Sequence, residues 1–215
     1  MDDKTLRQFI IDELDFEPSV NAANIGVAAE KGVITLTGHA NSYAEKHAVE
    51  QAVRRIKGVR GIAEEIKVRY PGDKKTDDDQ IAERAVNIIA WNATLPDDEV
   101  KVQVTGGWVT LEGTVEWNYQ RVAAESSVRK LTGVVGVTNH IVVKPHLQPS
   151  DIKGKILAAL KRDAELEADS IHVDVDGSKV KLEGKVKAWR ERVVAERAAW
   201  AAPGVTSVID NLRIV

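Results

Sequence analysis

Apolar residues near the start of the chain change from a helical spacing to an alternating one. Between Leu6 and Leu14 they recur every three or four residues, which predicts an amphipathic helix ending near Asp15. From Ile25 to Leu36 they alternate with other residues around a Glu-Lys-Gly turn, which predicts a β-hairpin with one buried face. The chain therefore begins with a helix and two antiparallel strands.

A second helix and a third strand follow the hairpin. Ser42, with Glu45 three residues later, has the form of a capping box, and the apolar spacing continues to Lys57. Gly58 marks the helix stop, and the apolar positions from there to Val68 indicate a strand. Because a helix joins the second and third strands, these two strands should run parallel.

This order of elements is written three times, without a gap within the aligned units. The hairpins share a motif, which reads VITLTG at 33–38, WVTLEG at 108–113 and KVKLEG at 179–184. The repeated units are residues 4–69, 79–144 and 150–215. An internal repeat of this length predicts small domains in tandem. The polar segment 71–79 is expected to be a flexible linker and 145–149, with two prolines, a semi-rigid one.

Each unit is predicted to be an α+β domain with the element order αββαβ. Its three-stranded mixed sheet has both helices packed on one face. The other face is exposed or used for packing, since a domain this small buries only about 60% of its unfolded surface. Trp108 is a candidate contact on that face, because the equivalent residues are Val33 and Lys179.

Two sets of glycines are identical in all three units. The first set is expected to end the second strand, and consists of Gly38, Gly113 and Gly184. The second is expected to stop the second helix in a left-handed conformation, and consists of Gly58, Gly133 and Gly204. Both sets are therefore interpreted as structural turn residues.

A glutamate in the second helix is also identical in all units, at positions 50, 125 and 196. One interpretation is a ligand or an acid. The alternative is a helical ion pair, of Glu50 with Arg54, of Glu125 with Arg129 and of Glu196 with another base. The structural interpretation is preferred, because such charges on a helix are usually solvated.

At this point the residues support a resemblance to a known family. The motifs VITLTG with GVRGI, WVTLEG with GVVGV and KVKLEG with GVTSV resemble the BON domain, the bacterial osmotic-stress protein and nodulation module. The resemblance covers nearly the whole chain in three copies. It implies an αββαβ fold, a non-enzymatic role, association with membranes or phospholipids, and links to osmotic stress and envelope integrity.

The composition excludes several classes of function. The 215-residue chain has 43% hydrophobic residues, 29% charged residues and a formal net charge of −3. Acidic and basic residues are interspersed, so no nucleic-acid partner is expected. Cysteine is absent, which excludes disulfides and a thiol nucleophile. The start of the chain does not read as a secretory signal, so we expect a cytoplasmic protein, or a periplasmic one if a signal has been removed.

The sequence holds no recognisable catalytic or metal-binding motif. The five histidines occupy different repeat positions without metal-ligand spacing. The segment Asp174–Gly177 matches only a fragment of a calcium loop and falls in a predicted turn. No dinucleotide, phosphate-loop or nucleophile-elbow motif occurs. We therefore predict that the protein is not an enzyme and uses no cofactor and no metal.

Basic and aromatic residues gather in the third unit. The candidate lipid or partner contacts are Lys185, Lys187, Trp189, Arg190, Arg192 and Trp200, together with Trp108 in the second unit. Such residues suit a membrane interface. Alternatively, the basic residues complement helix dipoles and the tryptophans pack between units.

The leading hypothesis is a non-catalytic binding or scaffold protein acting in osmotic or envelope stress. Its expected partner is an anionic phospholipid or a membrane-associated protein. The alternative is a self-assembling structural or protein-interaction module without lipid binding, for which a homo-oligomer is the expected state.

Overall fold

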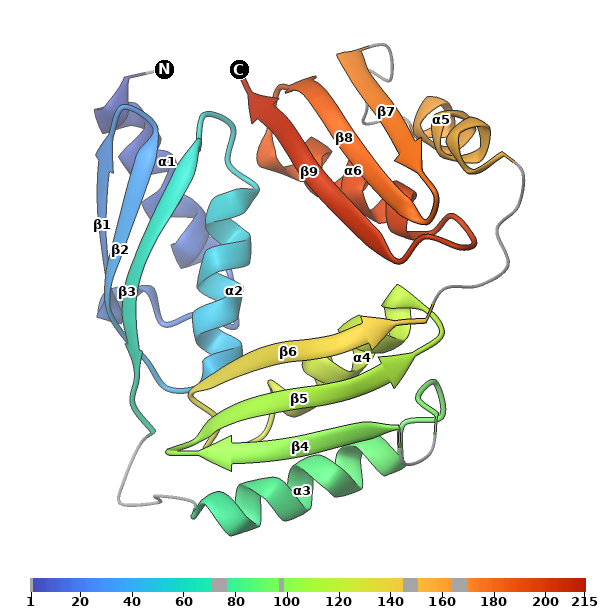
Figure 1. Cartoon of the computed structure of the whole chain (residues 1–215). Coiled ribbons are helices and arrows are strands. Elements are labelled where there is room, and N and C mark those ends of the chain that lie inside the picture. Colours follow the sequence, from blue (N-terminus) through green and yellow to red (C-terminus); the bar gives the residue numbers. More distant parts are fainter. Residues whose placement is uncertain (1, 71–76, 97–98, 145–150, 164–169) are drawn as a thin grey trace. The chain divides into compact units, whose positions relative to one another are not determined.

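The computed structural model describes residues 2–70, 77–96, 99–144, 151–163 and 170–215 (Figure 1). Residues 71–76 and 145–149, on which the linker predictions depend, lie outside the described residues. By its contacts the chain divides into two compact units, Met1–Val142 and Val143–Val215. The first unit holds two repeats and the second holds the third repeat.

Each repeat has the predicted element order. The first contains α1 (Asp3–Phe16), the short 3-10 helix η1 (Ala22–Asn24), β1 (Ile25–Glu30), β2 (Val33–Ala40), α2 (Tyr43–Arg54) and β3 (Gly61–Val68). The second contains α3 (Asp78–Ala90), β4 (Val100–Thr105), β5 (Trp108–Val115), α4 (Asn118–Val128) and β6 (Gly136–Val143). The third contains α5 (Ile152–Arg162), β7 (Ile171–Asp176), β8 (Lys179–Val186), α6 (Trp189–Trp200) and β9 (Ser207–Ile214).

The sheets confirm the predicted topology. Their strand orders are β1-β2-β3, β4-β5-β6 and β7-β8-β9, so the second strand of each repeat is central. The hairpin strands β1 and β2 pair antiparallel, with Val27 opposite Leu36. The strands β2 and β3, joined by a helix, pair parallel, with Ile34 opposite Ile62. The third sheet follows the same pattern.

Each core lies between the helices and one face of the sheet. In the first repeat Ile10 of α1 and Val53 of α2 share a buried cluster with Ile34 and Leu36 of β2. Both helices therefore cover the same face, as predicted. The intervening strand residues, such as Thr37, point to the outer face. That outer face is the part of the sheet that is open to a partner.

The first helix and the hairpin turn are joined by an acidic side chain. The carboxylate of Asp3 accepts hydrogen bonds from the backbone N–H groups of Lys31 (2.8 Å) and Gly32 (3.2 Å). In the second repeat Asp78 accepts from the N–H groups of Gly106 (2.7 Å) and Gly107 (2.8 Å). The turn is thus held by a residue far away in the sequence, because its N–H groups have no ladder partner.

The second helix begins with the predicted serine cap. Ser42 accepts a hydrogen bond from the N–H of Glu45 at 3.0 Å. The Glu45 carboxylate does not reach back to Ser42, as a full capping box requires. It accepts instead from the N–H groups of Asn41 (2.7 Å) and Asn21 (2.9 Å). This buried carboxylate therefore ties α2 to the loop that precedes the hairpin.

The prediction that the first glycine set ends the second strand is wrong. Gly38, Gly113 and Gly184 lie inside β2, β5 and β8, two residues before each strand ends. Their φ angles are 113°, 148° and 133°. A Cβ atom at Gly113 would lie 2.0 Å from the carbonyl oxygen of Glu99. The glycines are therefore needed for a close backbone approach within the hairpin.

The second glycine set has the expected positive φ but a different place. Gly58, Gly133 and Gly204 have φ angles of 98°, 96° and 90°. However, α2 ends at Arg54 and not at Lys57, so Gly58 lies in the turn that follows the helix. The N–H of Val59 donates to the carbonyl of Ile56 at 3.3 Å in this turn. The glycine directs the chain into the third strand after the helix has ended.

Candidate binding surfaces

Trp108 lies on the outer face of the second sheet. Its side chain is 49% exposed. The indole N–H donates to the hydroxyl of Thr138 at 2.7 Å. The ring covers Gly136, where an added Cβ atom would lie 2.4 Å from it. Trp108 is therefore a fixed aromatic surface that takes the place of the side chain that Gly136 lacks.

Phe16 and Trp91 are far more exposed than Trp108, and the sequence analysis did not select them. Phe16, at the end of α1, is 83% exposed, and Trp91, directly after α3, is 88% exposed. They occupy equivalent positions of the first two repeats, since the aligned units place Phe16 on Trp91. Each lies two residues after the last buried position of its helix, Leu14 or Ile89, and two residues of helix lead to the opposite face. This spacing was the signal that could have identified them.

Within α6, the candidate residues Trp189 and Arg192 lie together. The guanidinium carbon of Arg192 is 5.7 Å from the centre of the Trp189 ring, which is a cation–π distance. Arg192 also forms an ion pair with Asp210 of β9 and donates to the Asp210 carbonyl at 3.3 Å. The charge of Arg192 is thus balanced inside the third repeat.

Trp200 packs against the core of the third repeat as a partly buried residue. Its indole N–H donates to Glu196 at 3.4 Å. In the described residues Glu196 thus accepts at helical spacing from a tryptophan, where a base was expected. The pairs predicted for the other two repeats are confirmed, because Glu50 binds Arg54 and Glu125 binds Arg129. These glutamates are helix-surface partners.

The remaining basic candidates of the third repeat are exposed. They are Lys185 at the end of β8, Lys187 before α6, and Arg190 in the first turn of α6. The backbone N–H of Lys187 donates to Glu191 at 2.8 Å, which fixes the start of the helix. The candidates thus separate into a balanced Arg192, a core-packed Trp200 and an exposed basic group. Trp108 belongs to the other compact unit.

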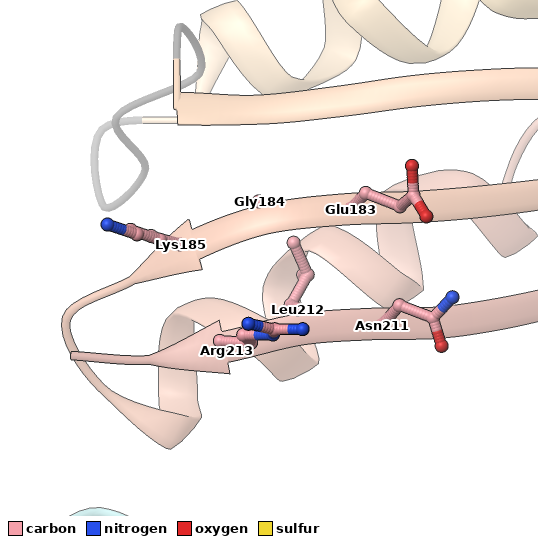
Figure 2. A pocket seen from close by; sticks show the side chains of 6 residues that line it. All are labelled: Glu183, Gly184, Lys185, Asn211, Leu212 and Arg213. Carbon is pink, nitrogen blue, oxygen red and sulfur yellow. The ribbon is translucent and has the colours of Figure 1, made fainter.

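Arg213 is a basic residue that the sequence analysis missed. In the parallel ladder it lies directly opposite Lys185. Both residues line a hollow of about 530 Å³ with Glu183, Gly184, Asn211 and Leu212. Figure 2 shows the two basic side chains near the ends of β8 and β9. Glu183 and Asn211 lie further from these strand ends. Arg213 could have been identified only from the register of β9 on β8, which places it beside Lys185.

The ammonium of Lys181 lies 2.6 Å from the carboxylate of Glu183, next to this hollow. The hydrogen bond and the opposite charge raise the pKa of Lys181 and lower the pKa of Glu183. Both groups therefore remain charged over a wide range of pH.

His47 of α2 is the histidine with a distinct environment. It is half-buried, and burial lowers the pKa of its imidazole, with a further lowering by Arg129, which directly follows α4 in the same compact unit. The carboxylates of Glu50 and Glu125 act in the opposite direction. Burial is the larger effect, so the neutral form is favoured.

Tyr70, after β3, forms a hydrogen bond within the first compact unit. Its hydroxyl donates to the carbonyl of Val134, and burial raises the pKa of the phenol. This bond links the end of the first repeat to the turn after α4 in the second.

The described residues contain no group of three or more histidine, aspartate or glutamate side chains placed to hold a metal ion. Across that same part of the chain, every helix is too short or too polar to cross a bilayer.

Comparisons with known proteins give one family and one curated relative. A family model described as BON domain matches residues 2–70, 77–145 and 149–215. Osmotically-inducible protein Y of Escherichia coli strain K12 is 28% identical over 153 residues, which is 67% of this chain and 74% of the relative.

Two solved structures have weaker likeness to the chain. Both are of CdsD, a structural protein of the type III secretion system of Chlamydia trachomatis. One has a TM-score of 0.27 at 15% identity and covers 98% of this chain and 92% of its own. The other, its C-terminal domain, has a TM-score of 0.28 at 14% identity with full coverage of both chains, 100%. These scores are too low to carry a functional conclusion.

Proposed function

This chain belongs to the BON domain family, and from that premise we propose that it is a non-catalytic binding protein of the osmotic or envelope stress response that contacts anionic membrane surfaces. The similarity to osmotically-inducible protein Y supports the stress context. The αββαβ repeats supply a rigid support, and the contact is made by side chains outside the three cores.

The observation that carries the proposal is the exposure of Phe16 and Trp91. Phe16 and Trp91 expose large apolar surfaces at the same position of two repeats, and exposed apolar surface favours an interaction site. Phe16 is the last residue of α1, and Trp91 directly follows α3. An aromatic ring at such a position enters the headgroup region without any change to the fold. Two equivalent rings in tandem repeats act together.

Basic residues add the preference for anionic lipid. Lys187 and Arg190 are exposed beside the start of α6. Each basic group near an anionic surface contributes about 1 kcal/mol, and this contribution falls off with added salt. Arg192 is left out of this set, because it is held against Asp210 and the Trp189 ring. The first compact unit therefore supplies aromatic insertion, and the third repeat supplies a separate, weaker and salt-sensitive attraction.

Co-sedimentation with vesicles tests this proposal. The full chain is mixed with phosphatidylglycerol-containing or neutral vesicles at low and physiological salt. Binding to anionic vesicles is expected, and Phe16→Ser and Trp91→Ser should each weaken it at least about tenfold, since an aromatic side chain transferred from water contributes roughly 1.5–3 kcal/mol.

Tyr119→Ser is the matched control, because Tyr119 is also exposed but lies at the start of α4. Trp189→Ala and Arg190→Ala report on the third repeat and should reduce binding mainly at low salt. If the full chain fails to sediment with anionic vesicles at either salt concentration, the membrane proposal is wrong.

A second function is favoured by Trp108. A fixed, half-exposed indole on a sheet face is suited to protein contact, because it supplies a large apolar area with little loss of side-chain entropy. Under this alternative the outer face of the second sheet drives self-assembly or partner docking. Light scattering should then show a mass that rises with concentration, and Trp108→Ala should abolish the rise. A constant monomer mass would exclude self-assembly.

A further inference from the structure

The hollow at the end of the third sheet contains two like charges in register. Lys185 of β8 lies directly opposite Arg213 of β9, and both side chains are exposed. Two like charges held side by side on neighbouring strands repel each other. The pair therefore does not help the fold, which raises the question of what balances it.

The rest of this sheet face is arranged differently. Opposite charges face each other across the hairpin, with Asp174 opposite Lys181 and Asp176 opposite Lys179. Within the described residues no carboxylate forms an ion pair with Lys185 or Arg213. The positive charge is thus concentrated at one end of the face, beside the hollow.

The acidic residue lining the hollow is already engaged. Glu183 binds Lys181 at 2.6 Å and interacts with the side chain of Asn211. In Figure 2 Glu183 and Asn211 lie further from the ends of β8 and β9 than the two basic residues do. Glu183 therefore forms a wall of the hollow, while its own charge is balanced from the other side.

The other repeats show that the fold does not need two cations here. The equivalent residues are His39 and Lys67 in the first repeat, which are also register partners. In the second repeat they are Thr114 and Val142. The same strand positions accept a hydroxyl and an isopropyl group, so the Lys185–Arg213 pair is a property of the third repeat alone.

We propose that Lys185 and Arg213 form a binding site for a phosphomonoester group. Such a group carries close to two negative charges at neutral pH, which two adjacent cations match. The planar guanidinium donates two parallel hydrogen bonds to two phosphate oxygens, and the ammonium adds a point charge. The hollow of about 530 Å³ leaves room for a small organic group on the phosphate. This site goes beyond the proposed membrane contact, because it needs no bilayer.

Titration of the full ¹⁵N-labelled chain with glycerol 3-phosphate at low ionic strength tests the site. Saturable shifts are expected for backbone amides near Lys185 and Arg213. Lys185→Gln and Arg213→Gln should each weaken binding at least about tenfold, as expected when a charge-assisted hydrogen bond is lost. Arg213→Lys should retain part of the affinity, since it keeps the charge and loses the fork.

Lys179→Gln is the matched control, because it removes the same charge from the other end of β8, where Asp176 faces it. It should leave the affinity unchanged. Both glutamine variants at the site should keep the dispersed spectrum of a folded chain, since they remove a like-charge contact. Absence of saturable shifts with the full chain, or equal weakening by Lys179→Gln, overturns the proposal.

The source of the phosphomonoester is distinguished with vesicles. Phosphatidate carries a monoester headgroup, whereas phosphatidylglycerol carries a diester. A lipid ligand predicts stronger binding to phosphatidate vesicles that Arg213→Gln reduces, and a soluble ligand predicts shifts with glycerol 3-phosphate but no such reduction. Binding to phosphatidylglycerol that depends on Phe16 and Trp91, with no phosphomonoester effect, would support the membrane proposal and reject this site.

Discussion

At the scale of single residues, the glycines inside the second strands show how one backbone contact constrains a sequence. Gly113 combines a φ of 148° with a Glu99 carbonyl oxygen 2.0 Å from where a Cβ would be. Gly106, in the hairpin turn, also has a positive φ, 59°, but nothing lies within 4 Å of its added Cβ. A comparison of the two positions therefore separates the cost of a strained backbone from the cost of a steric collision.

We predict that Gly113→Ala is more destabilising than Gly106→Ala. The turn substitution should cost about 1–2 kcal/mol, the usual cost of a left-handed conformation with a side chain. The strand substitution adds the collision with Glu99, for a total of about 3 kcal/mol or more. Urea unfolding of both variants measures the difference in the free energy of unfolding. Equal values would show that the hairpin relaxes freely around Gly113.

His47 leads to a prediction about acid. Its folded pKa lies below the ordinary value of about 6.5, mainly because of burial. The folded state therefore binds the proton less tightly than the unfolded state. This contribution to stability is complete above pH 6.5 and is lost as pH falls from 6.5 through the folded pKa.

His47→Val removes this titration, and valine is the residue at the equivalent positions 122 and 193. Below pH 6.5 the variant should lose less stability than the original chain, as measured by urea unfolding over a pH series. Parallel pH profiles for the two proteins would contradict the assignment to His47.

The structural roles of these residues could be predicted from the sequence only in part. The repeat itself selected Gly113 and its equivalents as structural. Their place inside the strand could not be predicted, because it depends on the carbonyl of Glu99, which approaches from the neighbouring strand. The same holds for Arg213, whose meaning depends on the register of β9 on β8. Contacts across strands are not contained in local spacing.

At the scale of elements, one repeated contact links the second helix to the third strand. Lys46 binds Glu64 at 2.8 Å in the first repeat, and Arg192 binds Asp210 in the third. In the second repeat Asn139 donates to the Arg121 carbonyl at 2.9 Å. An uncharged amide therefore performs the same connection.

We predict that Asp210→Asn is milder than Asp210→Ala. Asp210 also accepts from the N–H of Leu212 at 2.9 Å, and Asn139 accepts from Ile141 at 3.1 Å in the same way. Asparagine keeps this bond and should cost about 1 kcal/mol, whereas alanine leaves donors unsatisfied and should cost about 2–3 kcal/mol. Thermal or urea unfolding compares them. A loss as large with asparagine as with alanine would show that the ion pair alone matters.

Element types were easier to predict than element ends. Helical and alternating spacing identified the helix and strand order of each repeat, because one face of each element is buried. The end of α2 was placed at Lys57, but the helix ends at Arg54. The apolar spacing continues through the following turn, since Ile56 packs against the same core. Burial therefore extends a pattern beyond the hydrogen bonds that define the helix.

At the scale of the whole molecule, each repeat described by a core cluster is self-contained. The third cluster draws its buried residues only from Ile152 to Leu212. A fragment of residues 149–215 should therefore fold alone, although a domain of this size is marginal. A dispersed NMR spectrum and a cooperative urea transition are expected. A disordered fragment would show that the third repeat needs the rest of the chain.

The αββαβ order was predictable at this scale because three aligned copies reinforce one pattern. The exposed aromatics were not selected, although Phe16 follows the buried Leu14 by two residues and therefore lies off the apolar face of α1. Function therefore depends on positions that the shared fold does not constrain.

The outer faces of the sheets have a consequence for the evolution and the design of such repeats. Val33, Trp108 and Lys179 occupy one position on the same support, and each is compatible with it. A duplicated repeat can thus change its recognition chemistry by substitutions on one strand face while its interior stays constant. Transplanting the outward residues of one sheet onto another should move a binding property between repeats without a new fold.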